Sequence, residues 1–208
     1  MHQEAITLKA GQLLSALIKF KPLKNFCLVG GTALALQIGH RVSVDFDWFG
    51  QKPLPKNLLK QIKDFFSGRK ILVDVLKTEE LTVRIDGVQI TFLQYPFPWT
   101  EKPLPQNGFF MASVGQIAAM KAQTINRRSV LKDYVDLYFI FKNRYADLND
   151  IINKSKTAFK EEFNPRLFLE QLVYMEDIAD EKMEFLKNRP DKQKIQKFFE
   201  NLVKKVKI

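Results

Sequence analysis

Residues 28–49 read LVGGTALALQIGHRVSVDFDWF, and this stretch decides the fold that the sequence predicts. An apolar run ends at the pair Gly30-Gly31, a segment of good helix formers follows, and Gly39 marks its end. Over residues 42–49 apolar and polar side chains alternate with a period of two, which is typical of a half-buried strand. We therefore expect a strand, a glycine turn, a short helix and a second strand, in that order.

The second strand carries two carboxylates, Asp45 and Asp47, which should point to one face. Neighbouring carboxylates repel each other unless a cation lies between them, and Mg²⁺ prefers oxygen ligands and often bridges to substrate phosphates. The turn at Gly30-Gly31 would offer backbone N–H groups and the positive end of a helix to an anion, with Thr32 adding a hydroxyl donor. The stretch predicts a metal site facing a phosphate site, the alternative being a plain turn and solvated acids. Two further residues that could contact phosphate or ribose are Arg41 and Ser43.

Charge and composition favour an anionic partner. The 208 residues are 46% hydrophobic, which is typical of a globular protein. Their net charge of +10 favours nucleic acid or nucleotide as a partner. The alternative is a lysine-rich surface with no such partner. The single cysteine, Cys27, excludes an intrachain disulfide framework and fits a reducing compartment. We see no signal-peptide pattern and no apolar run of membrane length, so we expect a cytoplasmic protein.

Hydrophobic periodicity divides the rest of the chain into two parts. The first part contains helical patterns over 5–20 and 57–66 and strand patterns over 71–76, 81–85 and 88–93. A proline- and aromatic-rich segment, 95–105, can continue neither a helix nor a central strand. Five helical patterns follow it, over 113–127, 130–143, 147–160, 165–177 and 190–206. We therefore expect an α/β core over residues 1–100 and a helical domain over 106–208.

A second group of charged residues lies in the helical part. The pattern over 131–141 is apolar almost all round, which predicts a buried helix, yet it contains Asp133 and Asp136 three residues apart. Buried carboxylates need partners. The cations close by in the sequence are Lys121, Arg127, Arg128 and Lys132. On this evidence alone, a salt-bridge network that ties two helices together is the favoured interpretation.

The motifs also carry a family resemblance. Gly30-Gly31-Thr32, Gly39-His40-Arg41 and Ser43-x-Asp45-x-Asp47 together resemble the signature of the AbiEii/AbiGii-type nucleotidyltransferase toxins, within the DNA polymerase beta-like nucleotidyltransferase superfamily. A lysine, an arginine-rich turn and a Lys-Asp-x-x-Asp-Leu segment, here Lys121 to Leu137, are similar to a second motif of these toxins. The resemblance covers most of residues 26–142. It implies an α+β fold: an N-terminal polymerase beta-like domain, with a mixed sheet and flanking helices, followed by a helical part that contributes to the site.

The resemblance further implies roles for these residues. Lys121 would bind the triphosphate of a nucleotide, and Asp136 with Asp133 would orient Lys121 or assist the acceptor hydroxyl. Asp45 and Asp47 would hold Mg²⁺ or Mn²⁺ during transfer of a nucleoside monophosphate from an NTP to an acceptor such as RNA or tRNA. The protein would be a toxin with a separately encoded antitoxin.

One feature departs from the superfamily pattern. Many of these transferases have a third carboxylate on a later strand, but residues 88–92 contain no acid, and Asp74 on an earlier strand is only a weak substitute. The sequence therefore assigns no general base. Two alternatives follow: a non-catalytic nucleotide- or RNA-binding module on a degenerate transferase fold, and a transferase that modifies a small molecule, as antibiotic-modifying nucleotidyltransferases do.

Overall fold

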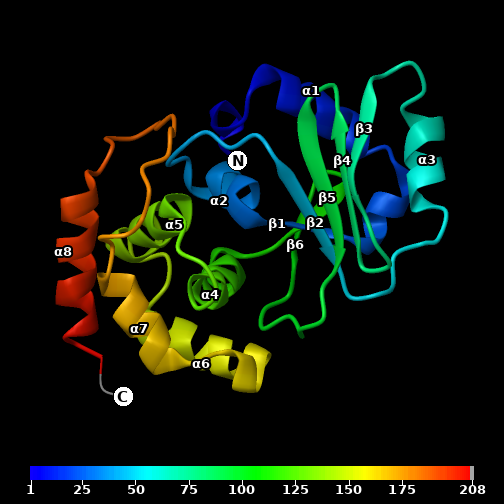
Figure 1. The fold of residues 1–208 in the computed structure, drawn as a ribbon. Helices are drawn as coiled ribbons and strands as arrows, with labels where there is room; N and C mark the ends of the chain where they lie inside the picture. The colour runs from blue at the N-terminus through cyan, green and yellow to red at the C-terminus, as the bar shows by residue number, and fades with distance from the viewer. Residues whose placement is uncertain (207–208) are drawn as a thin grey trace.

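The computed structural model describes residues 1–206, and these form an α+β fold with one seven-stranded mixed sheet, as predicted (Figure 1). The strand order is β3-β4-β5-β2-β1-β7-β6. The strands are β1 Cys27–Val29, β2 Phe46–Gly50, β3 Ile71–Leu76, β4 Glu80–Ile85, β5 Val88–Gln94, β6 Leu104–Gln106 and β7 Phe109–Met111. The α-helices are α1 Leu8–Leu17, α2 Gly30–Ile38, α3 Leu58–Phe65, α4 Val114–Ile125, α5 Leu131–Lys142, α6 Leu148–Phe159, α7 Pro165–Val173 and α8 Lys192–Val203.

Strand β2 lies at the centre of the sheet and positions the acidic pair. It pairs antiparallel with β1, with Asp47 opposite Val29, and parallel with β5, with Asp47 opposite Thr91. Phe46 and Trp48 are fully buried in the core. Because side chains alternate along a strand, Asp47 points to the opposite face.

The predicted strand over residues 42–49 is wrong in its first half, since β2 begins only at Phe46. The backbone before β2 forms hydrogen bonds outside the sheet. The N–H group of Val42 donates to the carbonyl oxygen of Glu184 at 2.8 Å, and that of Ser43 donates to the carbonyl oxygen of Ala5 at 2.8 Å. These bonds replace ladder partners in the sheet. Ser43 and Asp45 therefore lie in an extended connection rather than in a strand.

The sheet also contains two strands that the sequence analysis did not predict. Strand β7 pairs parallel with β1, and β6 pairs with β7 at the edge of the sheet. The edge position explains how Pro105 can lie in β6, because proline cannot donate to a central ladder. The sheet thus draws strands from both sides of the proline-rich segment, whereas the predicted division placed residues 106–208 in a helical domain.

The helical layer packs α4 and α5 against α2, with α6, α7 and α8 around them (Figure 1). The five helices predicted for this part are all present, although α7 ends at Val173 rather than near residue 177. One continuous hydrophobic core joins the sheet to α4 and α5. Among the described residues, none of the helices combines the length and hydrophobicity that crossing a membrane requires.

The segment between α7 and α8, residues 174–191, returns to the start of the fold. Besides the bond from Val42, the N–H group of Leu186 donates to the carbonyl oxygen of His40 at 3.1 Å, and Phe185 forms an isolated bridge with Arg41. In Figure 1 this orange segment runs beside the connection between α2 and β2. The C-terminal part therefore helps to fix the residues that precede the acidic pair.

Candidate active site

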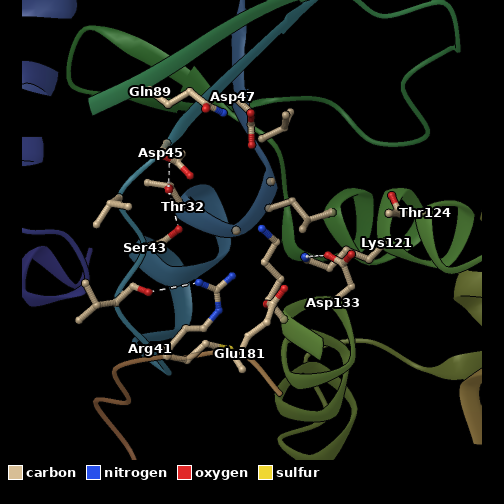
Figure 2. A pocket seen from close by; sticks show the side chains of 18 of the residues that line it. Thr32, Arg41, Ser43, Asp45, Asp47, Gln89, Lys121, Thr124, Asp133 and Glu181 are labelled. Carbon is tan, nitrogen blue, oxygen red and sulfur yellow. Dashed lines mark hydrogen bonds and ion pairs between the residues drawn. The ribbon is translucent and has the colours of Figure 1, made fainter. Parts of the chain in front are cut away.

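A cleft of about 840 Å³ lies between the sheet and the helical layer and collects most of the residues singled out in the sequence (Figure 2). One wall comes from the end of β1, the start of α2 and the residues up to β2. The other wall comes from α4, α5 and the segment before α8. Of the predicted site residues, those that line it are Gly30, Gly31, Thr32, Arg41, Ser43, Asp45, Asp47, Lys121 and Asp133.

The acidic wall consists of Asp45 and Asp47, both half-buried. Burial, and next the neighbouring charge of Asp45, raise the pKa of Asp47 to about 6, and the cations across the cleft only partly oppose this. A raised carboxyl pKa means that the protein disfavours the ionised form of Asp47. A bound cation would stabilise that form.

The glycine turn is shaped by its contact with the acidic wall. Gly30 has φ +71°, and a Cβ there would lie 2.5 Å from Oδ2 of Asp47; a Cβ at Gly31 would collide with Nη2 of Arg41. Val29, the N-cap residue of α2, makes no side-chain hydrogen bond to the helix. The first N–H groups of α2 are therefore uncapped beside the cleft, where they can bind an anion.

We expect Gly30→Ala to weaken nucleotide binding by about tenfold or more. The substitution forces alanine into a left-handed conformation that costs ~1–2 kcal/mol, and its methyl group displaces the Asp47 carboxylate. Gly68→Ala is a matched control, since Gly68 has φ +83° and nothing within 4 Å of its Cβ position. Calorimetric titration with NTP and Mg²⁺ checks the prediction, which equal losses in the two variants would contradict.

Thr32 has a different contact from the one predicted. Its side chain is buried, and its hydroxyl donates to the backbone oxygen of Asp45 and lies 2.8 Å from Oγ of Ser43. The hydroxyl is thus engaged within the protein rather than free to donate to phosphate. Thr32 fixes the connection that carries Asp45 against α2.

A buried ionic network underlies the opposite wall. Nζ of Lys121, on α4, lies 2.8 Å from Oδ1 of Asp133 and 2.6 Å from Oδ2 of Asp136, both on α5. Nε and Nη2 of Arg41 donate to the two oxygens of Asp136 at 2.7 and 3.0 Å. Nε2 of His40 is 2.6 Å from Oδ1 of the same carboxylate. A salt-bridge network between α4 and α5 is therefore present, but of the four cations expected as partners only Lys121 takes part among the described residues. Arg127 instead pairs with Glu162, and Arg41 and His40 from the first motif join the network.

Asp136 is the centre of this network and lies below the cleft rather than in its lining. Its carboxylate has no exposed surface. Burial alone would raise its pKa, but Arg41 and Lys121 hold that pKa well below the ordinary value. Asp136 is thus placed to orient Lys121 and Arg41, and its distance from solvent leaves it no direct access to an acceptor hydroxyl.

Lys121 keeps one donor for the cleft. An ammonium group has three N–H donors, and two of them are directed at Asp133 and Asp136. Burial would lower the pKa of Lys121, but the two carboxylates raise it, so the group stays charged. The arrangement presents a fixed positive charge toward the acidic wall.

Several cleft residues were missed by the sequence analysis. Glu181, Lys182, Met183 and Glu184 line the cleft from the segment before α8, and no motif or periodicity marks that segment. Gln89 lines it from β5. Asp74, the weak substitute for a third carboxylate, does not line it: Asp74 lies on edge strand β3, where its Oδ2 is 2.7 Å from Nε of Arg84.

The glycine turn, the carboxylates of Asp45 and Asp47, and Lys121 thus line one cleft. The sequence model of the family described as "Nucleotidyl transferase AbiEii toxin, Type IV TA system" matches residues 12–206, so this chain belongs to the AbiEii nucleotidyltransferase toxin family. The protein is therefore a nucleotidyltransferase enzyme, as predicted.

Comparison with individual proteins gives one sequence relative and two structures of similar fold. The uncharacterized protein aq_aa25 of Aquifex aeolicus (strain VF5) is 33% identical over 184 residues, which cover 86% of this chain and 87% of that protein. MenT4, the nucleotidyltransferase toxin Rv2826c of Mycobacterium tuberculosis H37Rv, superposes with a TM-score of 0.60 at 12% identity, over 96% of this chain and 84% of MenT4. JHP933 of Helicobacter pylori superposes with a TM-score of 0.54 at 17% identity, over 94% of this chain and 95% of JHP933. These two structures show the same fold.

Proposed function

We propose that this enzyme transfers a nucleoside monophosphate from a Mg²⁺-bound NTP to a hydroxyl group of RNA, with tRNA as the candidate acceptor. The observation that carries the proposal is the convergence of the uncapped start of α2, the pair Asp45 and Asp47, and the charged Lys121 on one cleft. The family description supports a toxin role and a separately encoded antitoxin.

The acidic wall fits a hard divalent cation. Asp45 and Asp47 offer only oxygen donors, and burial, followed by the charge of Asp45, raises the pKa of Asp47. Two protein carboxylates can suffice for Mg²⁺, since this ion keeps waters and takes substrate phosphates as further ligands. Within residues 1–206 no larger cluster of potential metal-ligating side chains is found. Mg²⁺ or Mn²⁺ held by these two residues would polarise the α-phosphate and neutralise its charge.

The chain's own groups position the nucleotide. The N–H groups at Gly30 and Gly31 bind phosphate oxygens, and the remaining donor of Lys121 contacts the triphosphate from the other wall. Arg41 adds positive charge beside Gly31 while Asp136 fixes its guanidinium. Catalysis then rests on orientation and on charges that are in place before the substrate arrives.

The rim of the cleft favours a polyanionic acceptor over a small molecule. Arg128, Lys132 and Lys182 line the cleft with exposed side chains. Within the described part of the chain none of the three forms an ion pair. Cations without acidic partners at an opening are suited to the phosphates of a nucleic acid.

The direct test is incubation with each of the four α-labelled NTPs, Mg²⁺ and total RNA. The proposal expects label in RNA and a preference for one or more nucleotides. Absence of both label transfer and NTP binding would contradict it. If the chain were instead a non-catalytic RNA-binding module, RNA binding would survive loss of Asp45 and Asp47 and would fall steeply with salt.

Binding of Mg²⁺ and NTP should weaken as the pH falls through about 6. The pKa of Asp47 is about 6, so its carboxyl group is mostly charged at pH 7.5 and mostly protonated at pH 5. A protonated carboxyl group does not bind a cation, so the affinity at pH 5 should be roughly tenfold lower. Calorimetry at both pH values measures this. Asp47→Asn is the control for protonation of the NTP itself, and an equal pH response in that variant would contradict the assignment.

A further inference from the structure

The side chain of Gln89 has a defined orientation in the cleft. Gln89 on β5 is paired across the sheet with Arg84 on β4, and Nη2 of Arg84 donates to Oε1 of Gln89 at 2.9 Å. A guanidinium group has only donors, so the amide oxygen must face Arg84. Nε of Arg84 is in turn 2.7 Å from Oδ2 of Asp74. With its oxygen bound to Arg84, Gln89 keeps its NH₂ group available as a hydrogen-bond donor in the cleft.

The sheet order places Gln89 on the far side of the carboxylates from the glycine turn. Strand β2 lies between β1, which leads into Gly30, and β5, which carries Gln89. Asp47 is opposite Val29 on one side and opposite Thr91 on the other. Gln89 is two residues before Thr91 and therefore points to the same face of the sheet as Asp47. Figure 2 shows Gln89 beside Asp45 and Asp47, with Arg41 and Lys121 farther along the cleft.

The geometry of phosphoryl transfer determines which reactant lies on the side of the cleft that carries Gln89. The attacking and leaving oxygens lie roughly in line across the phosphorus. The acceptor oxygen forms a bond to the α-phosphorus, and the bond from that phosphorus to the bridging oxygen breaks. Pyrophosphate leaves with the electron pair, and the hydroxyl proton passes to water. If the glycine turn and Lys121 hold the β- and γ-phosphates, the acceptor hydroxyl must approach from the opposite side, where Gln89 lies.

We propose that Gln89 positions the acceptor, with its NH₂ group donating a hydrogen bond to the oxygen of the attacking hydroxyl. Arg84 and Asp74 are positioning residues outside the cleft that hold the amide in this orientation. A donor at this place takes no proton from the hydroxyl. The residue therefore orients the acceptor, and it does not replace the missing third carboxylate as a base. This inference rests on the proposed function.

The test is steady-state transfer from labelled NTP to unfractionated tRNA by Gln89→Ala. One hydrogen bond is worth about a factor of ten, so kcat/KM for tRNA should fall about tenfold. The KM and the dissociation constant for NTP with Mg²⁺ should stay within about twofold, because the triphosphate side is unchanged. Arg84→Ala should cause a smaller loss, roughly threefold, since the amide can then rotate. Arg69→Ala is the matched control, because Arg69 forms a comparable exposed ion pair with Asp86.

Gln89→Glu separates a donor from a base. If the position needs a donor, the glutamate variant should lose at least as much activity toward tRNA as the alanine variant. Higher activity in Gln89→Glu than in wild type would overturn the inference and assign a base to this position. If wild type transfers label to tRNA and Gln89→Ala does so equally well, the inference about Gln89 is overturned and the proposed acceptor is not. A wild type that transfers no label to tRNA overturns the proposed acceptor together with it. Thermal unfolding of every variant excludes misfolding as the cause.

Discussion

Replacing Asp45 and Asp47 together by alanine is expected to lower nucleotide transfer by about a thousandfold or more. A metal ion at a reacting phosphate contributes several kcal/mol of charge stabilisation, and each 1.36 kcal/mol is about a factor of ten in rate. The other carboxylates that line the cleft lie on the opposite wall: Asp133 is tied to Lys121, and Glu181 and Glu184 come from the segment before α8. Label transfer from NTP to RNA measures the effect.

The melting temperature of the Asp45→Ala/Asp47→Ala variant should not fall, although its activity does. The pKa of Asp47 is raised from an ordinary 3.8 to about 6, so above pH 6 the ionised group costs the folded state more than the unfolded state. Removing it should keep or raise the melting temperature at pH 7.5. Asp64→Ala/Asp150→Ala, which removes two exposed acids from α3 and α6, is the matched control for net charge. A lower melting temperature in the Asp45/Asp47 variant would show that the pair is structural.

Local patterns account for much of the fold. Helical periodicity placed α4, α5, α6 and α8 to within three residues, and the strand patterns over 81–85 and 88–93 placed β4 and β5. The burial of Asp133 and Asp136 also followed from sequence, because a helix that is apolar all round must be buried and its acids must then find cations.

The remaining features depend on contacts between distant residues. Residues 42–45 have the alternation of a strand but bond to Ala5 and Glu184, which lie far away in the sequence. Nothing near residues 181–184 indicates that they line the cleft. These two cases depend on tertiary contacts, which periodicity does not supply. The orientation of Gln89 arises instead from a local contact, the cross-strand pair with Arg84 five residues earlier, which no motif marks.

Asp136→Ala should cause the largest loss of stability of any single substitution in the network. Removing one partner of a buried ion pair costs ~3–5 kcal/mol, because the opposite charge stays buried and unpaired. Here two cations, Arg41 and Lys121, lose that partner, and only Lys121 keeps another in Asp133. At ~2–4 °C per kcal/mol for a chain of this size, the melting temperature should fall by roughly 10 °C or more.

The pH dependence of stability identifies the cause of that loss. The pKa of Asp136 is well below its ordinary value because Arg41 and Lys121 outweigh burial. A depressed carboxyl pKa contributes stability that is present above the unfolded pKa and is lost as the pH falls through the folded pKa. The difference in unfolding free energy between wild type and Asp136→Ala should therefore be full at pH 7 and shrink in acid. Glu162→Ala, which breaks the exposed pair with Arg127, should cost less than about 1 kcal/mol. Equal losses in the two variants would mean that the buried network does not hold the two walls of the cleft together.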